Sequence, residues 1–332
     1  MQTSPSKAAS SPVPFAEDER ISVGTRNFLK ALNGAGGDPL ETVGPEAARK
    51  VLEGAQASVD VDLSGIDESI VTIETASGPI ELNIVRPEGN SDKLPVFVFI
   101  HGGGWVLGDY PTHKRLVRDL VVESGYVAVF VNYTRTPEAV YPQQINESYA
   151  AAKWVAENGD AINVDASRLA IVGNSVGGNL TAATTLKAIA EGTPSISSAI
   201  MLWPVTDADF DRESWAEFGA DRFLTAPLMK WMWDLYAPPE KRGEPLATPF
   251  NASVDQLKEF PPTLIQVAEN DILRDEGEAF GRKLDEAGAE VTTIRYDGAI
   301  HDFGLLNALA NEPSTRSMIR HAAAELKARL GN

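Results

Sequence analysis

The chain has 332 residues, more than the commonest single domain of about 100 to 150, so we expect one large domain with an accessory part. A composition of 43% hydrophobic and 23% charged residues indicates a sizeable buried core and excludes disorder throughout. The 29 basic and 47 acidic residues leave a formal net charge of -18, which predicts that nucleic acid and anionic membrane surfaces are repelled. The absence of cysteine excludes disulfides, thiol nucleophiles and thiolate metal sites.

The N-terminal region divides into two parts. Residues 1–15 are rich in Ser, Ala and Pro, a composition typical of a disordered arm, and they lack the apolar stretch of a signal peptide. We therefore expect a cytoplasmic protein, and no apolar run approaches the roughly 20 residues that a membrane anchor requires. Residues 16–57 show helical spacing of apolar side chains around a turn at 34–39, which predicts two helices that contribute to a cap.

The rest of the chain predicts an α/β fold. Residues 69–76 and 80–86 alternate around a Ser-Gly-Pro turn, as an antiparallel hairpin does. Later strands are predicted from short apolar runs at 96–100, 126–131, 169–172, 199–203 and 263–268, with one more at 291–296, and helix-like stretches separate them. The fold class is a doubly wound, mostly parallel sheet, with residues 58–204 and 246–332 as its core.

One stretch interrupts this alternation. Residues 205–245 are too many for an ordinary connection and are rich in aromatic side chains, which predicts a helical cap inserted over the carboxyl edge of the sheet. Some of these side chains could line a substrate pocket, although a role in the core of the cap is an equal alternative for each. The candidates are Trp215, Phe218, Phe223 and Leu224, together with Trp105 outside the cap.

Ser175 is the candidate nucleophile. It lies in Gly173-Asn174-Ser175-Val176-Gly177, a G-x-S-x-G string that follows a predicted strand and opens a predicted helix. This setting exposes a serine hydroxyl at the top of a sheet, and the flanking glycines leave room for the crowded turn. A turn that only packs is the alternative, whereas a phosphate loop would need a Gly-Lys-Ser/Thr ending that is absent.

A serine nucleophile needs a base, and His301 is best placed among the four histidines. It follows the last predicted strand across a short loop at 297–300. His113 and His321 lie in predicted helices, where packing or surface roles are favoured, and His101 adjoins a glycine loop described below.

The acid that orients the base is predicted to be Asp271, which follows the strand at 263–268 and completes the order Ser, Asp, His. Asp275 and Glu276 are rivals, but they begin a helix, where acidic residues satisfy its free N–H groups. Asp302 is too close to His301 in sequence to orient that ring, and we expect it to be solvated.

The loop His101-Gly102-Gly103-Gly104-Trp105 is the candidate donor of N–H groups to a developing oxyanion. It directly follows the predicted strand at 96–100, and its glycines allow a backbone to approach a ligand closely. A dinucleotide-binding G-x-G-x-x-G is excluded because Leu107 occupies the place of its last glycine.

From about residue 70 to the end, the chain resembles the hormone-sensitive lipase family of α/β-hydrolases, also called bacterial esterase family IV. The resemblance rests on the glycine loop, on Tyr133-Thr134-Arg135-Thr136-Pro137-Glu138 in place of a similar Tyr-Arg-Leu-Ala-Pro-Glu, and on the three triad candidates. It implies that the N–H groups of Gly103, Gly104 and Val176 form the oxyanion hole. It also implies that His101 braces the loop, that no metal or cofactor is needed and that short acyl chains are favoured.

The chain departs from the family at two places. The family usually reads Gly-Asp-Ser-Ala-Gly-Gly where this chain has Asn174 and Val176, and Asp302 replaces a common glycine. The branched side chain of Val176 is expected to narrow the acyl pocket.

The sequence therefore predicts a serine carboxylesterase that hydrolyses small-molecule, short-chain esters through an acyl-enzyme on Ser175. Acyl transfer and amide hydrolysis on the same triad are alternatives. A hormone receptor of related fold is less favoured, because His301 is present. A homo-oligomer is compatible with the sequence.

Overall fold

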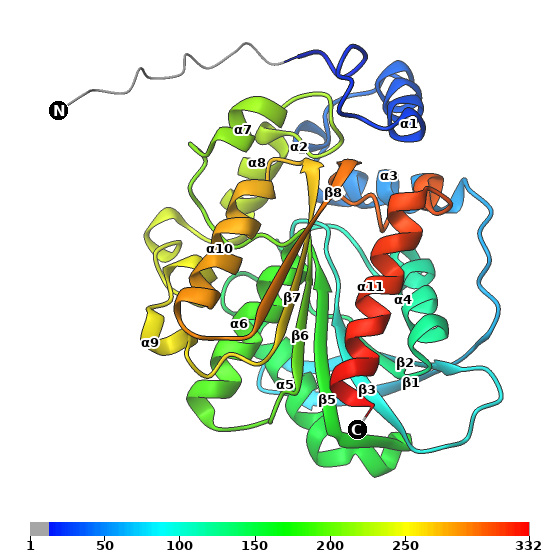
Figure 1. The fold of residues 1–332 in the computed structure, drawn as a ribbon, viewed down its shortest axis with the longest axis vertical. Helices are drawn as coiled ribbons and strands as arrows, with labels where there is room; N and C mark the ends of the chain where they lie inside the picture. The colour runs from blue at the N-terminus through cyan, green and yellow to red at the C-terminus, as the bar shows by residue number, and fades with distance from the viewer. Residues whose placement is uncertain (1–12, 332) are drawn as a thin grey trace.

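One mixed sheet forms the centre of the molecule. The structure, a computed structural model, describes residues 13–331, so nearly all of the predicted arm over residues 1–15 lies outside the described residues. Within this range eight strands pair in the order β1-β2-β4-β3-β5-β6-β7-β8, with β1 and β2 antiparallel and all strands from β4 to β8 parallel (Figure 1). The strands are β1 (Ile66–Thr75), β2 (Gly78–Pro87), β3 (Leu94–Ile100), β4 (Val127–Val131), β5 (Val164–Asn174), β6 (Ser198–Leu202), β7 (Thr263–Asn270) and β8 (Val291–Ile300). The prediction of a doubly wound, mostly parallel sheet is confirmed.

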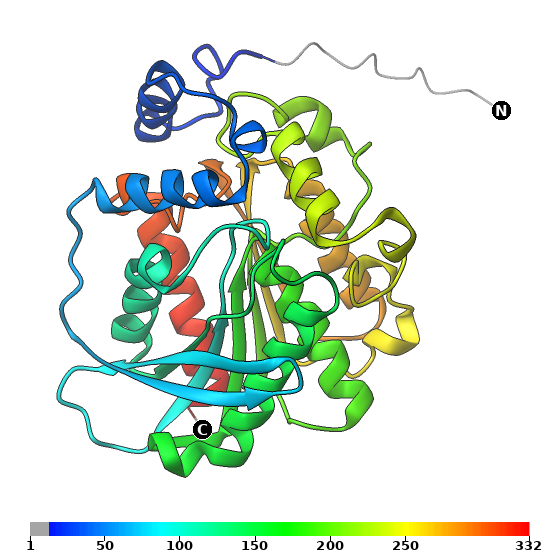
Figure 2. The same ribbon diagram turned by 180° about the vertical axis from the view of Figure 1, so that it is seen from behind.

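Helices cover both faces of the sheet. α4 (Tyr110–Ser124) and α11 (Pro313–Leu330) lie together on one face, and α5 (Gln143–Asn158), α6 (Val176–Glu191) and α10 (Arg274–Glu286) lie on the other (Figures 1 and 2). The remaining helices are α1 (Val23–Gly34), α2 (Leu40–Val43), α3 (Pro45–Ala57), α7 (Glu213–Phe218), α8 (Ala226–Tyr236) and α9 (Val254–Leu257), and short 3-10 turns occur at Gly159–Ile162, Pro239–Lys241, Pro249–Asn251 and Asn307–Leu309.

The parallel strands contribute apolar side chains to two hydrophobic cores, one on each face of the sheet. In β3, Val96 and Val98 pack with the side of α5 and α6, whereas Phe97 and Phe99 pack with α4 and α11. Successive side chains of a strand point to opposite faces, so a strand covered on both faces must be apolar at every position. This is why the sequence shows runs rather than alternation here.

Two predicted boundaries were wrong. Residues 297–300 form no loop but continue β8, because its pairing with β7 resumes beyond an irregularity and joins Asn270 to Ile300. His301 therefore follows the strand directly. Residues 23–57 form three helices instead of two, because the four residues of α2 form a separate short helix directly after the predicted turn at 34–39, and Gly44 separates it from α3.

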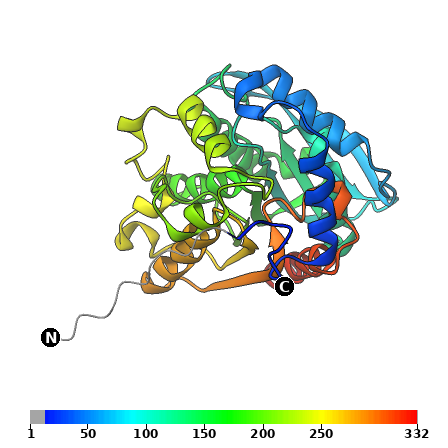
Figure 3. The same cartoon turned by 90° about the horizontal axis from the view of Figure 1, so that it is seen from above.

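The carboxyl ends of the parallel strands face a layer of helices. α7 and α8 belong to the segment between β6 and β7, and α8 contacts α2 from the N-terminal region. Seen from above, the N-terminal helices and the segment with α7 and α8 cover different sides of this end of the molecule (Figure 3). We call residues 205–245 the cap. Among residues 13–331 no helix is long and apolar enough to cross a membrane.

Candidate active site

Ser175 occupies a sharp turn between β5 and α6. Its φ of 56° and ψ of -122° lie in a region that non-glycine residues rarely adopt, which marks a strained position. Neighbouring glycines make the turn feasible: a Cβ on Gly173 would overlap the backbone of Gly177, and one on Gly177 would overlap the carbonyl of Ile100. The turn therefore has the strand-turn-helix geometry that the sequence predicted.

The structure brings the three predicted triad residues together. Nε2 of His301 lies 2.9 Å from Oγ of Ser175, and Nδ1 of the same ring lies 2.7 Å from Oδ2 of Asp271. Ser175, Asp271 and His301 directly follow β5, β7 and β8, whose carboxyl ends meet at one edge of the parallel sheet. All three side chains are buried. The hydroxyl, imidazole and carboxylate thus form a continuous hydrogen-bonded line.

The charge state of His301 depends on two carboxylates. Burial alone would lower the pKa of this imidazole, but the charges of Asp271 and Asp302 and the hydrogen bond to Asp271 outweigh burial and raise the pKa above its ordinary value. A raised pKa favours the imidazolium, the state that the ring would reach on taking a proton from Ser175.

The glycine loop lies beside the turn of Ser175. Gly103 and Gly104 have φ values of 102° and 64°, which side-chain-bearing residues rarely adopt. Within residues 13–331 neither of their N–H groups donates a hydrogen bond. The third predicted donor is the N–H of Val176, which is the first residue of α6. N–H groups with no partner at a helix start are suited to receive a developing negative charge.

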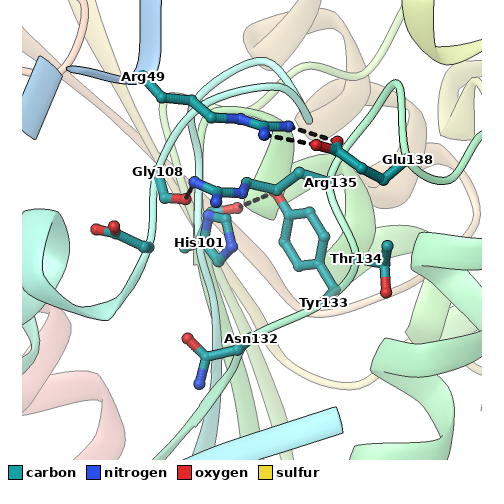
Figure 4. A pocket seen from close by; sticks show the side chains of 9 residues that line it. Arg49, His101, Gly108, Asn132, Tyr133, Thr134, Arg135 and Glu138 are labelled. Carbon is teal, nitrogen blue, oxygen red and sulfur yellow. Dashed lines mark hydrogen bonds and ion pairs between the residues drawn. The ribbon is translucent and has the colours of Figure 1, made fainter. Parts of the chain in front are cut away.

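Three side chains brace this loop and the residues directly after it by donating to backbone carbonyls. Tyr133 donates to the carbonyl of His101 (3.0 Å), Arg49 to that of Val106 (2.8 Å) and Arg135 to that of Gly108 (2.7 Å). Figure 4 shows these residues around a cavity of about 320 Å³, where Arg49 also pairs with Glu138. Neither Ser175 nor His301 lines this cavity. The residues around this cavity therefore support the glycine loop and take no direct part in the triad.

His101 fits the bracing role that the family resemblance implied. Its Nδ1 lies 2.8 Å from the carbonyl of Gly102, and its ring stacks on Tyr133 with centroids 4.1 Å apart. Burial lowers the pKa of this imidazole well below its ordinary value, so the ring is neutral. His113 is buried in α4 and His321 contacts the Tyr296 hydroxyl, both consistent with packing roles. Among residues 13–331 no group of three or more His, Asp or Glu side chains could hold a metal ion.

The predicted pocket residues all have packing partners, some in the cap and some in the N-terminal region or the core. The ring of Trp105 stacks on Tyr236 with centroids 3.9 Å apart, and Phe218 is surrounded by the guanidinium groups of Arg20, Arg222 and Arg274. The other three candidates also have packing partners: Trp215 contacts Phe210, Phe223 contacts Phe28, and Leu224 is buried in the core cluster that includes the cap. These contacts account for their burial, and substrate contact stays a prediction.

Two expectations about carboxylates were wrong. Asp302 is not solvated but is 6% exposed, and its Oδ1 accepts hydrogen bonds from Trp203 (2.7 Å) and Asn174 (3.2 Å). Asp275 and Glu276 do begin α10, but they accept hydrogen bonds from the cap and not from their own helix. Asp275 accepts from the N–H of Ser214, and Glu276 accepts from the N–H groups of Thr206 and Asp207. These acids therefore connect the cap to the core.

Sequence reasoning missed the residues that hold the loop after His301. Arg115 of α4 donates to the carbonyls of Gly304 (2.6 Å) and Leu305 (2.7 Å), and Gln56 of α3 also donates to Leu305 (3.0 Å). A charged residue on the buried side of an amphipathic helix was the signal for Arg115. No sequence signal identified Gln56, because its partner is 249 residues away.

Comparison with known proteins identifies the family of the chain. The family model for the alpha/beta hydrolase fold matches residues 97–305. The chain belongs to this family. The resemblance to its hormone-sensitive lipase branch is confirmed as well.

Several proteins to which the chain is similar are named as esterases. A thermostable esterase from Pseudomonas putida ECU1011 has 53% identity to the chain and a TM-score of 0.93, with 94% of this chain and 98% of that one covered. An esterase of Gibberella moniliformis is 32% identical over 90% of this chain and 95% of its own. Ethyl acetate hydrolase of Pseudomonas putida is 31% identical over 82% of this chain and 87% of its own. The prediction of a carboxylic ester hydrolase that acts on small molecules is confirmed.

Proposed function

We propose that Ser175, His301 and Asp271 hydrolyse carboxylic esters through an acyl-enzyme. One observation carries this proposal: the hydroxyl of Ser175, on a strained turn, lies 2.9 Å from Nε2 of an imidazole whose Nδ1 contacts a buried carboxylate. The serine oxygen attacks the ester carbonyl carbon while His301 takes the hydroxyl proton. His301 then gives this proton to the departing alcohol, and the acyl group remains on Ser175. Water, deprotonated by His301, attacks the acyl-enzyme and releases the acid.

The N–H groups of Gly103, Gly104 and Val176 are proposed to bind the oxyanion of both tetrahedral intermediates. The positive φ of the two glycines and the start of α6 at Val176 support this role. Donors fixed in place before the reaction stabilise the charge that develops on the carbonyl oxygen, and loss of one such donor reduces the rate by about 100 to 1000-fold.

We propose a preference for short acyl chains. The side chain of Val176 is buried in the same core cluster as cap residues, which limits the space beside the acyl carbon of an ester on Ser175. The relative named ethyl acetate hydrolase supports the same preference. The side chains proposed to contact the rest of the substrate are Trp105, Trp215, Phe218, Phe223 and Leu224.

The test is a series of p-nitrophenyl esters from acetate to decanoate, assayed with the purified chain. We expect kcat/KM to fall at least about tenfold between butanoate and decanoate, since each methylene that a pocket excludes changes binding by about 1 to 3 kcal/mol. Equal rates on acetate and decanoate would contradict the short-chain preference. The variant S175A should lose nearly all activity, and S148A, which removes a different buried serine hydroxyl, should keep it.

Transfer of the acyl group to an alcohol, or hydrolysis of an amide, would use the same three residues. Adding an alcohol to the ester assay separates transfer from hydrolysis, because transfer yields a new ester in place of the acid. The domain boundaries, a cytoplasmic location, exclusion of nucleic acid and a homo-oligomeric state stay predictions.

A further inference from the structure

Two positions at which the chain departs from its family are in contact. Nδ2 of Asn174 donates a hydrogen bond of 3.2 Å to Oδ1 of Asp302. The other end of the same amide accepts a hydrogen bond of 3.0 Å from the N–H of Gly102. Asn174 precedes Ser175 and Asp302 follows His301, so this amide connects the flanks of the nucleophile and the base to the glycine loop.

Asp302 is held in an unusual position for a carboxylate. It is 6% exposed, which is rare for a carboxylate, and its φ of 57° is uncommon for residues other than glycine. Trp203 donates to its Oδ1 at 2.7 Å, and its Oδ2 lies 3.9 Å from Nε2 of His301. The second carboxylate therefore faces the nitrogen that contacts Ser175, on the opposite edge of the ring from Asp271.

Asp302 determines which side chain can occupy position 174. An amide can donate to Asp302 with one end and accept from Gly102 with the other, whereas an aspartate can only accept. An aspartate at 174 would place two buried carboxylates within hydrogen-bond distance of each other, where like charges cannot both ionise without a large penalty. A carboxylate at 302 thus requires an amide at 174.

We propose that Asn174 and Asp302 are a matched pair of positioning residues, in which the amide fixes Asp302 beside His301 and Asp302 supplies a second negative charge to the imidazolium. The proposal rests on the proposed role of His301 as the base. The pair also connects the loop that follows His301 to the glycine loop through Gly102, so the geometry of both loops depends on it.

The pKa of His301 depends on burial and on two carboxylates. Burial disfavours the charged form of the imidazole, but the charges of Asp271 and Asp302 outweigh burial and raise the pKa. His113 of α4 also faces Asp302, but burial lowers its pKa to about 4 despite Asp302 and Asp109, with Arg115 lowering it further. His113 is therefore neutral when His301 titrates. Removing Asp302 should lower the pKa of His301 and move the acid limb of kcat/KM to lower pH.

The experiment uses N174D, D302G and N174D/D302G, each assayed for kcat/KM against pH and for thermal unfolding. Glycine suits the positive φ at 302. We expect N174D to reduce kcat/KM about tenfold more in the wild-type background than in the D302G background, since contacting residues show coupling of this size. D302G alone should move the acid limb to lower pH, a shift that a merely structural role would not produce.

N179D is the matched control. Asn179 is also buried, and its amide donates to the carbonyl of Ala247, so N179D buries the same charge nearby, in α6. Its effect should be equal with and without D302G. Additive effects of N174D and D302G, or an unmoved acid limb in D302G, would overturn the proposal. If N174D does not fold, a folded N174D/D302G supports the pair, and an unfolded one contradicts it.

The proposed function can fail separately. If S175A keeps its activity, the role of the triad is wrong, whereas the coupling between residues 174 and 302 is still measured by thermal unfolding.

Discussion

Oδ2 of Asp271 lies 2.7 Å from Nδ1 of His301, and both side chains are almost completely buried. A carboxylate at this distance keeps the proton on Nδ1, which leaves Nε2 free to accept the proton of Ser175. The N–H of Leu273 donates to Oδ1 of Asp271 at 3.0 Å, so the carboxylate itself is fixed in orientation. The end of β7 and the turn after it therefore fix Asp271, and Asp271 in turn orients His301.

Replacing this carboxylate by an amide tests that alignment. D271N should keep the fold but favour the wrong tautomer of His301, and kcat should fall by about 1000 to 10000-fold. The control is D275N, which changes the rival acid on α10, where its carboxylate accepts from Ser214 instead of contacting the histidine. We expect D275N to lose less than tenfold in kcat. If D275N were the more damaging of the two, the assignment of the acid would be wrong.

Val176 is expected to limit acyl length. V176A removes two methyl groups from a fully buried position beside the nucleophile, which opens space at the acyl carbon of a bound ester. The ratio of kcat/KM for hexanoate over acetate should rise about tenfold, within the range that one or two methylenes produce in an apolar pocket. The backbone N–H remains, so activity on acetate should persist. An unchanged ratio in folded V176A would show that this side chain does not face the acyl group.

How far the sequence predicts this molecule depends on the range of the contacts involved. The turn at Ser175 is specified locally, because a strand, a glycine on each side and a following helix all lie within a few residues of each other. Asp271 and His301 could be placed because parallel strands bring their carboxyl ends to one edge. These rules concern backbone topology, and they place residues that directly follow strands.

Contacts between side chains of distant segments could not be predicted in the same way. Asp302 was expected to be solvated because most aspartates are, and only the fold brings it against Trp203, whose indole N–H needs a buried acceptor. Trp203 stands at the end of β6 and was interpreted only as part of a strand. The boundary of β8 was missed because Asp297 and Gly298 favour turns, and pairing with β7 overrode that preference.

The N-terminal segment is fastened to the cap by a buried ion pair. Asp18 contacts Arg222 at 2.7 Å, and each side chain is 3% exposed. D18N would leave the guanidinium of Arg222 buried without a carboxylate, and we expect a loss of about 3 kcal/mol in the free energy of unfolding. Chemical denaturation measures this loss. The control D255N removes an exposed partner of Lys258 and should change stability by less than about 1 kcal/mol. Equal effects of the two variants would contradict a fastening role.

Glu276 should make stability depend on pH. Burial raises the pKa of its carboxyl from 4.5 to about 8, so between these values the folded chain holds a proton that the unfolded chain releases. Stability contributed by this group therefore falls as pH rises from about 5 to 8, by roughly 2 to 4 kcal/mol.

E276Q removes this titration while its amide oxygen can still accept from Thr206 and Asp207. Unfolding free energies measured across this pH range should decline less in E276Q than in the wild type. Parallel profiles for the two proteins would show that Glu276 is not a buried acid that gains a proton on folding.

Ser175 is proposed to be the nucleophile that His301 activates. A fluorophosphonate probe tests this proposal most directly, because it reacts with the hydroxyl of a serine that a base has activated, and peptide mass spectrometry then locates the adduct. We predict one adduct on the wild-type chain, at Ser175, lost in S175A and greatly slowed in D271N. Folded, ester-hydrolysing protein that acquires no adduct at Ser175, or S175A that is labelled as fast as the wild type, would contradict the account.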